Sequence, residues 1–465
     1  MTVIITFLVF LLAFVVIGAY AAKHKRESTI DDYLLAGRDV GPWFTGISAM
    51  ATNASGFFFV GLIGTTYTSG ISAAWIMVGW TFGAYFTWFF IPERLREQSV
   101  AQNAKTIPFF LGGSVDGWLP RSTAAVATLL FLGAYASAQL SAGSKALQVL
   151  FGWDYAVGAV IGAVIVLIYC YSGGIRASIW TDVAQAFVMI GSIFVLAVAG
   201  VNAAGGFSSL WRQLQAIDPQ LTQLVPGDLP FGFGLYLLGW FGAGAGMIGQ
   251  PHIMVRMMAV RRPQDLRISR HVYCLGNAAL ATFSITAALC CRVLLASDQA
   301  FDPELALPML SLQLLPPVLV GLLIAGLFAS TMSTADSQVL VCSSAITQDL
   351  FPSWRDSYVK AKLGTVLVTA VMLAIALNAG ESVFAMVIMA WGALAAAFGP
   401  LMVVRCFGWK ASPQLATAMM LAGIAAVIAW RFAFNLSGAM YEVLPGMIAG
   451  FAVYAVGRSL DRNAM

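Results

Sequence analysis

Thirteen apolar segments, each long enough to cross a lipid bilayer as a helix, constrain this chain more than any other feature. They lie near residues 3–21, 41–65, 72–91, 122–146, 155–175, 178–203, 231–257, 271–296, 314–345, 360–379, 382–404, 412–431 and 440–457. A bilayer interior offers no water to backbone N–H and C=O groups, so each crossing segment must satisfy them internally as a helix. Hydrophobic residues form 60% of the chain and charged residues only 10%, too few to cover a soluble fold. The sequence predicts an all-α, multi-pass membrane protein.

Basic residues divide unevenly between the two sides of such a bundle. With the amino terminus outside, 21 of the 25 lysines and arginines fall in cytoplasmic connections, helix ends and the tail. The other four are Lys145, Arg212, Arg292 and Arg431. Because cytoplasmic loops are enriched in basic residues, we expect a multi-pass protein with the carboxyl terminus in the cytoplasm. The net charge of +4 then reports topology rather than nucleic-acid binding.

A stripe of hydroxyl groups lies in the ninth segment. Ser330, Ser333, Thr334 and Ser337 recur at helical spacing, and Asp336 lies beside them. A carboxylate in a membrane helix costs about 2.5–3.5 kcal/mol to insert, so it usually faces a cavity or a partner. Hydroxyl and carboxylate oxygens suit a hard cation, which predicts a site for an ion of the size of sodium. Two plainer alternatives are hydroxyls bonded to carbonyls one turn back and an acid paired with a lysine or arginine.

Two segments are poor continuous helices. In residues 48–59 (SAMATNASGFFF) small and polar residues replace bulky apolar ones, and residues 242–251 (GAGAGMIGQP) contain four glycines and a proline. Broken helices at matching places of two halves indicate the inverted repeats of a secondary transporter. Counting five segments from each break gives repeats of 41–203 and 231–404, with a leading helix at 1–22 and accessory helices at 411–457. The alternative is that the glycines only permit close helix packing.

Other function classes lack their signatures in this chain. The six cysteines form no CxxC pair and there are three histidines, so no transition metal or other cofactor is expected. The sequence contains no HExxH motif, no GxSxG with a partner histidine, no phosphate-binding loop and no repeated selectivity filter. An enzyme, a primary pump and a channel are therefore disfavoured. A membrane sensor without transport is the alternative from a different class.

An ordered set of short motifs carries a family resemblance. It comprises DDYLLAGR (31–38), TNASG (52–56), SGIS (69–72), GAY (83–85), WTD (180–182), GQPHI (249–253), MST (332–334), LVCSSAIT (340–347), AW (390–391) and AAFGP (396–400). The chain resembles the sodium:solute symporters, and within them the bacterial sodium/proline carriers. The resemblance implies a LeuT-type 5+5 inverted repeat with extra flanking helices. It also implies import of a small organic solute across the plasma membrane (the bacterial inner membrane) by alternating access, with Na⁺ as coupling ion. No obligatory protein partner is expected.

The resemblance assigns ion-binding roles to individual residues. The family's main sodium site falls on the carbonyls of Ala51, Ala54 and Ser330 and on the hydroxyls of Ser333 and Thr334. An acid near the inner exit path falls on Asp182, where Asp336 and Ser337 would complete a second cation site. The alternative for Asp182 is that it only favours the dipole in the first turn of its helix.

Solute contacts in the family fall on the first break and its neighbours: Asn53, Ser55, Gly56, Tyr135 and Trp391. Free amides at a helix break suit a carboxylate, and the two aromatic rings would pack on an apolar body or only on the protein. Arg38 matches a family arginine with a coupling or gating role, although it is equally explained as a positive-inside anchor.

Two positions depart from the proline carriers. Asn53 stands where those carriers have an aspartate, and Ala243 stands where they have a tryptophan. We expect proline or a related small amino acid as the solute. A sugar, a monocarboxylate, pantothenate or a sialic-acid-like compound are the alternatives.

Overall fold

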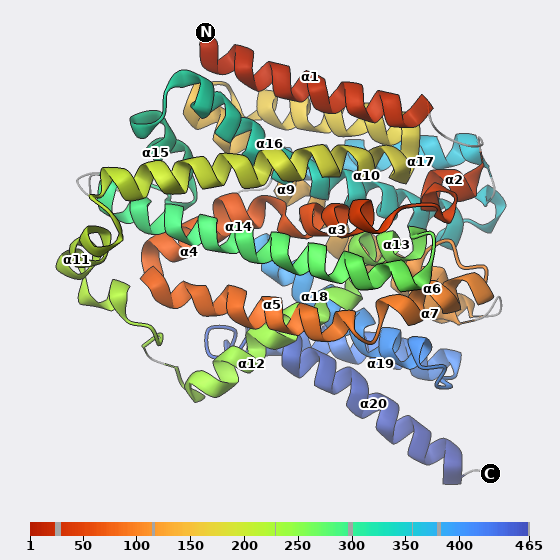
Figure 1. The fold of residues 1–465 in the computed structure, drawn as a ribbon. Coiled ribbons are helices and arrows are strands. Elements are labelled where there is room, and N and C mark those ends of the chain that lie inside the picture. Colours follow the sequence, from red (N-terminus) through yellow and green to blue (C-terminus); the bar gives the residue numbers. More distant parts are fainter. Residues whose placement is uncertain are drawn as a thin grey trace.

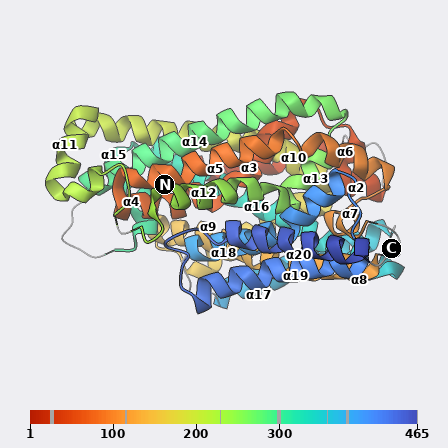
Figure 2. The same ribbon diagram turned by 90° about the horizontal axis from the view of Figure 1, so that it is seen from below.

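The computed structural model describes residues 1–23, 29–113, 117–227, 229–295, 301–355, 357–378 and 383–463. Within these ranges the chain folds into helices that lie side by side in a single bundle (Figure 1). Helices α4, α11 and α15 gather at one end of the bundle, and α2, α6 and α7 at the other, as the view from below also shows (Figure 2). Among the described residues, 11 helical stretches are long and apolar enough to cross a membrane. The predicted all-α membrane fold is confirmed.

Two of these stretches are too long for a single crossing. Pro42–Trp88 has 47 residues and Tyr155–Ala203 has 49, so each would measure about 70 Å as one helix. The hydrocarbon core of a bilayer is only about 30 Å thick. The first stretch turns at Gly70 (φ 68°) and the second at Gly174 (φ 56°). Each stretch therefore makes two crossings, which yields the thirteen predicted segments.

The first half of the chain contains α1 (Thr2–Lys23), α2 (Ile30–Leu35), α3 (Pro42–Gly56), α4 (Leu62–Ser69), α5 (Ala74–Trp88), α6 (Pro92–Ala101), α7 (Ile107–Gly112), α8 (Trp118–Ala127), α9 (Gly133–Phe151), α10 (Tyr155–Ala203) and α11 (Phe207–Ile217). The second half contains α12 (Gly232–Ala245), α13 (Pro251–Ala259), α14 (Leu266–Leu294), α15 (Ala306–Leu314), α16 (Pro317–Ser344), α17 (Tyr358–Asn378), α18 (Val383–Cys406), α19 (Pro413–Ile428) and α20 (Val443–Asn463).

Both predicted helix breaks are present. In α3, Ser55 has φ 51° and ψ −178°, and a π-helical turn over Phe57–Gly61 leads into α4. Between α12 and α13, a 3-10 turn over Gly246–Gly249 ends at Gln250, whose backbone is extended. The close-packing explanation for the glycines holds as well, because a Cβ on Gly249 would lie 2.7 Å from the α carbon of Ala395 in α18.

Helix α16 lies at the centre of the bundle, between α10, α9, α1 and α3. Every residue from Leu323 to Ser344 is buried. A helix that is buried on all sides has to place its polar groups against other protein groups or in a cavity. The hydroxyl stripe of α16 therefore faces the protein interior.

Candidate functional site

Five oxygen atoms form a compact group where α16 meets the broken helix α3. The Ser333 hydroxyl donates to the Ala51 carbonyl at 3.1 Å, and the Thr334 hydroxyl donates to the Thr52 carbonyl at 2.9 Å. Both hydroxyls also reach the Ser330 carbonyl of their own helix, each at 3.2 Å. All five residues are completely buried. We call these three carbonyls and two hydroxyls the oxygen group.

The break in α3 explains why a backbone carbonyl is available there. In a regular helix, the amides of Gly56 and Phe57 would donate to carbonyls four residues earlier, beginning with that of Thr52. Instead, the Gly56 amide donates to the side chain of Gln139 at 2.7 Å, and the Phe57 amide donates to the Ser55 hydroxyl at 3.1 Å. Side chains thus accept the hydrogen bonds of these two amides, and the Thr52 carbonyl is free to accept from Thr334 of α16.

The oxygen group overlaps the sodium site expected from the sequence in four of its five residues. Within the described residues, no side chain donates a hydrogen bond to the Ala54 carbonyl. The carbonyl of Thr52 is present in the group, and sequence reasoning missed it. Its signal was available, since Thr52 lies four residues before the glycine at the break. The plainer alternative for Ser333 and Thr334 also holds, because both reach back to Ser330 as well as across to α3.

A second polar group adjoins the first and contains two acids around one arginine. The guanidinium of Arg256 pairs with Asp182 at 2.9 Å and donates to the hydroxyls of Ser178 at 3.1 Å, Ser48 at 2.7 Å and Ser337. Arg256 and Asp182 are both fully buried. Arg256 is one of the 21 basic residues expected on the cytoplasmic side, but its side chain is buried within the protein. We call these residues, with Asp336, the Arg256 cluster.

The alternative explanation, that Asp182 lies in the first turn of its helix and only favours the helix dipole, is wrong. The helix that contains it begins after the turn at Gly174, so Asp182 lies about two turns inside the helix rather than in its first turn. One oxygen of its carboxylate accepts from Ser48 at 2.6 Å and from Thr52 at 3.3 Å, besides the ion pair with Arg256. Asp182 is therefore held by side chains from other helices.

Asp336 completes the cluster from α16. One of its oxygens accepts from Ser337 at 2.7 Å and from Ser178 at 3.0 Å. The other oxygen, like the second oxygen of Asp182, is buried and has no hydrogen-bond partner among the described residues. The structure thus brings together Asp182, Asp336 and Ser337, the candidates for a second cation site, and adds Arg256 to them.

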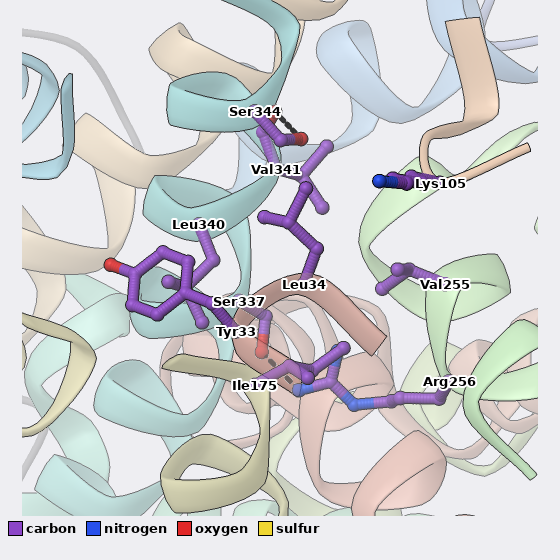
Figure 3. Close-up of a pocket in the computed structure, with 10 residues that line it drawn as sticks. All are labelled: Tyr33, Leu34, Lys105, Ile175, Val255, Arg256, Ser337, Leu340, Val341 and Ser344. Carbon is purple, nitrogen blue, oxygen red and sulfur yellow. Dashed lines mark hydrogen bonds between the residues drawn. The ribbon is translucent and has the colours of Figure 1, made fainter. Parts of the chain in front are cut away.

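Thr52 joins the two polar groups. Its carbonyl belongs to the oxygen group, and its hydroxyl lies 3.3 Å from both Asp182 and Ser337 of the Arg256 cluster. The cluster in turn borders a narrow pocket at the end of the bundle where α2, α6 and α7 lie. Figure 3 shows the lining residues of this pocket, which are Tyr33, Leu34, Lys105, Ile175, Val255, Arg256, Ser337, Leu340, Val341 and Ser344. Its volume of about 10 Å³ has room for about one water molecule.

The predicted solute residues gather around the break in α3, with one exception. Tyr135 donates to the Ser55 hydroxyl at 3.2 Å, and its ring lies 5.8 Å from that of His252. Asn53 donates to Asn277 at 3.0 Å. Both amides at the break, those of Gly56 and Phe57, already have side-chain partners, so a carboxylate would have to compete with these for them.

Trp391 is the exception, because it approaches the break through other aromatic rings. Its ring lies 4.5 Å from that of Trp80, which stacks on Phe57 at 5.7 Å. The Trp391 indole donates to the carbonyl of Ala243, the position that departs from the proline carriers. Sequence reasoning missed Trp80, which is an unremarkable aromatic residue in an apolar segment.

Several buried polar atoms at the two breaks and on neighbouring helices have no hydrogen-bond partner among the described residues. They belong to Asn53 (Oδ1), Trp80 (Nε1), Gln139 (Nε2), Gln250 (Oε1), His252 (both ring nitrogens) and Tyr273 (the hydroxyl). A buried polar atom without a partner costs about 1–3 kcal/mol, so such atoms are rare unless a ligand or water satisfies them. The set offers both donors and acceptors, as a zwitterionic solute requires.

Arg38 ties the segment before α3 to the neighbouring helices. Its guanidinium donates to the carbonyl of Ala104 at 2.8 Å, to the hydroxyl of Ser99 at 3.0 Å and to the carbonyl of Met258 at 3.4 Å. Burial lowers the pKa of Arg38 to about 10. These protein contacts go beyond what a lipid-facing anchor requires. The gating role stays a prediction.

A bundle with two broken helices, and with an oxygen-only group beside one of them, defines a secondary active transporter. A family model described as the sodium:solute symporter family matches residues 33–423. The chain therefore belongs to the sodium:solute symporter family, whose coupling ion is Na⁺.

Two curated relatives illustrate the sequence similarity. The sodium/proline symporter of Escherichia coli (strain K12) is 32% identical, and the alignment covers 96% of this chain and 91% of the relative. The high-affinity proline transporter of Bacillus subtilis (strain 168) is 31% identical over 93% of each.

Solved structures agree on the fold. A Na⁺-coupled sialic acid symporter in a substrate-bound outward-open state has a TM-score of 0.80 at 21% identity over 97% of each chain. Mhp1, a nucleobase-cation-symport-1 family transporter, has a TM-score of 0.60 at 15% identity, covering 93% of this chain and 95% of its own. The LeuT-type architecture expected from the resemblance is confirmed.

Proposed function

We propose that this protein imports proline, or a closely related small amino acid, together with Na⁺ by alternating access. The observation that carries the proposal is the oxygen group between α3 and α16. Its three carbonyls and two hydroxyls are hard oxygen ligands, which suit a sodium ion as the transported co-substrate. None of them carries a titratable proton near neutral pH, which favours sodium over a proton as the coupling ion.

The electrostatics of the break support a monovalent cation at this place. The carbonyls of Ala51 and Thr52 lie in the last turn before the backbone breaks at Ser55. The carbonyl end of a half-helix carries a partial negative charge that favours cations. The carboxylate of Asp182 contacts the Thr52 hydroxyl, which is not itself one of the five oxygens of the group. Partial charges of this kind bind a cation without holding it so tightly that it cannot leave.

The surroundings of the break support a small amino acid as the solute. Among the described residues, the buried N–H groups of Trp80 and Gln139 have no partner and can meet a carboxylate, and the side-chain oxygen of Asn53 has none and can meet an amino or imino group. The rings of Tyr135 and Phe57 flank the same place and can pack on a small apolar body. The relatives named for proline transport favour proline within this class.

We also propose the orientation and repeat boundaries that the sequence predicted. The amino terminus lies outside and the carboxyl terminus in the cytoplasm, because 21 of the 25 basic residues then lie on the cytoplasmic side. Residues 41–203 and 231–404 form the inverted repeats. Their breaks, at Ser55 and Gln250, occur in the first helix of each repeat.

Transport in proteoliposomes tests this function. Labelled proline should accumulate under an inward sodium gradient and should not accumulate under a proton gradient alone in sodium-free buffer. Competition by unlabelled amino acids, sugars, monocarboxylates, pantothenate and sialic acid then ranks the solutes. Sodium-driven uptake of a sugar, in a protein that does not transport proline and for which proline does not compete, would refute the amino-acid assignment. It would leave sodium symport unaffected. Sodium-dependent solute binding without any flux would favour the sensor.

A further inference from the structure

One arginine side chain closes the space between the oxygen group and the pocket of Figure 3. Arg256 lies on α13, which begins directly after the break at Gln250. Its guanidinium contacts side chains of α3 (Ser48), of α10 (Asp182 and Ser178) and of α16 (Ser337). Four helices that are separate in sequence are therefore held together at one buried cation.

The contacts place Arg256 on the route from the oxygen group to the pocket. Arg256 and Ser337 both line the pocket, and Figure 3 shows the guanidinium pointing at the Ser337 hydroxyl. On the other side, Ser337 lies 3.3 Å from the hydroxyl of Thr52, whose carbonyl belongs to the oxygen group. An ion that takes this route therefore meets the guanidinium of Arg256, which lines the pocket and donates to both Ser337 and Asp182.

The charge of Asp182 limits how the side chain of Arg256 can move. Asp182 is completely buried and is paired with a single cation, Arg256, among the described residues. A buried carboxylate that loses its only counter-charge is strongly destabilised. A sodium ion that leaves the oxygen group beside Thr52 arrives next to this same carboxylate. The ion and the guanidinium repel each other at such short range, so the two cations suit Asp182 in turn rather than together.

We propose that Arg256 is the latch of the sodium path. Its guanidinium holds Asp182 and Ser337 while the ion is bound in the oxygen group. The guanidinium withdraws with α13 as the ion passes to Asp182 on its way to the pocket. The backbone is extended at Gln250, so the helix is interrupted between α12 and α13, and the proposed movement of α13 would pivot there. The Asp182, Asp336 and Ser337 cluster then acts as a transit point whose resting cation is an arginine, rather than as a second resident sodium site.

This inference rests on the sodium coupling in the proposed function, but it does not depend on which solute is carried. The test measures the flux of radioactive sodium into proteoliposomes in the absence of any solute. R256Q removes the charge and most of the contacts of the latch. Because the guanidinium makes several charge-assisted hydrogen bonds, we expect the solute-independent sodium flux to rise at least about tenfold, with sodium binding retained. Accumulation of the solute should fall accordingly.

A matched control is available in the same molecule. Arg121 is also buried and pairs with a buried acid, Asp349, at 2.9 Å, but it lies outside the Arg256 cluster. R121Q removes a buried ion pair of the same kind, so it reports the general cost of such a loss. We expect a lower yield of folded protein from this variant and no sodium leak.

R256K keeps the inference testable if R256Q does not fold. A lysine preserves the charge but offers a single ammonium group, which cannot replace the planar fork of an arginine. Its leak should lie between those of the wild type and R256Q. The proposal would be overturned if the solute-independent sodium flux of R256K were the same as that of the wild type. The same holds for a folded R256Q that still binds sodium. By contrast, a wild-type protein that neither binds sodium nor shows any sodium-driven uptake would overturn the proposed function instead.

Discussion

Removal of the Ser333 hydroxyl is the most direct perturbation of the proposed sodium site. The side chain is completely buried and its hydroxyl touches two carbonyls of the oxygen group, those of Ala51 at 3.1 Å and Ser330 at 3.2 Å. Ser333→Ala removes the oxygen with little change in volume. The backbone of α16 is unaffected, because alanine is the best helix former. The variant should therefore fold and report on the ion.

The expected change in sodium affinity follows from the interaction that the sodium-free protein and the sodium-bound protein each lose in Ser333→Ala. Without sodium, the protein loses a neutral hydrogen bond, worth about 0.5–1.5 kcal/mol. With sodium bound, it loses a contact comparable to a hydrogen bond to a charged group, worth about 1.5–3 kcal/mol. The difference of about 1–1.5 kcal/mol raises the sodium dissociation constant by roughly 5- to 13-fold. Thr334→Ala removes the contact with Thr52 at 2.9 Å and should act to a similar extent.

The assay is solute uptake as a function of sodium concentration, with direct sodium binding to the purified protein as a second readout. Thr334→Ser keeps the hydroxyl and should retain most of the sodium affinity. Thr128→Ala is the matched control. Thr128 is buried, and within the described part of the chain its hydroxyl bonds to the Ala124 carbonyl one helix turn back and to no other group. Unchanged sodium dependence in both Ser333→Ala and Thr334→Ala would show that the hydroxyl stripe is structural.

Substitutions at three further positions separate the roles of the remaining candidates. Asn53→Asp adds a negative charge next to the oxygen group and should lower the sodium concentration for half-maximal uptake, whereas Asn53→Ala should not; equal values in the two variants would contradict this. Tyr135→Phe removes the hydrogen bond to Ser55 and should raise the KM for the solute by roughly 2- to 13-fold with sodium affinity unchanged, so a pure sodium effect would refute the assignment. Arg38→Gln should lower the maximal rate without changing the sodium affinity of the purified protein, and a wild-type rate would support the anchor explanation.

The sequence predicts the fold of this protein well because the membrane leaves few alternatives. Segment length and charge asymmetry determine the crossings, and the small residues at 48–59 and 242–251 mark the breaks. The turn at Gly174 could be placed only to within a few residues. The structure places it where a side chain would lie 2.3 Å from the carbonyl of Tyr33, and such a contact is invisible without the tertiary fold.

The site is less predictable, because its contacts join distant helices. The helical spacing of Ser333 and Thr334 identifies their hydroxyls as candidates from the sequence. Their partners are backbone carbonyls, which every residue has, so residue type does not identify them. Thr52 enters the group because its carbonyl is freed by the break, not because of its residue type. The buried position of Arg256 was missed for a different reason. Arg256 follows the second break and precedes a run of basic residues, so the charge count placed it with them at the cytoplasmic surface.

The two breaks and the buried arginine together suggest how ion binding and helix movement are coupled. The first break supplies carbonyls to the oxygen group, and the second separates α13, which carries Arg256, from α12. Thr52 connects the two, since its carbonyl belongs to the oxygen group and its hydroxyl faces Asp182. A sodium ion bound in the oxygen group would therefore stabilise the arrangement in which Arg256 is held. Loss of that ion would remove one of the contacts between α3 and α16 and would favour the proposed withdrawal of α13. Each break alone would only create a binding site, whereas the pair links occupancy of that site to closure of the path.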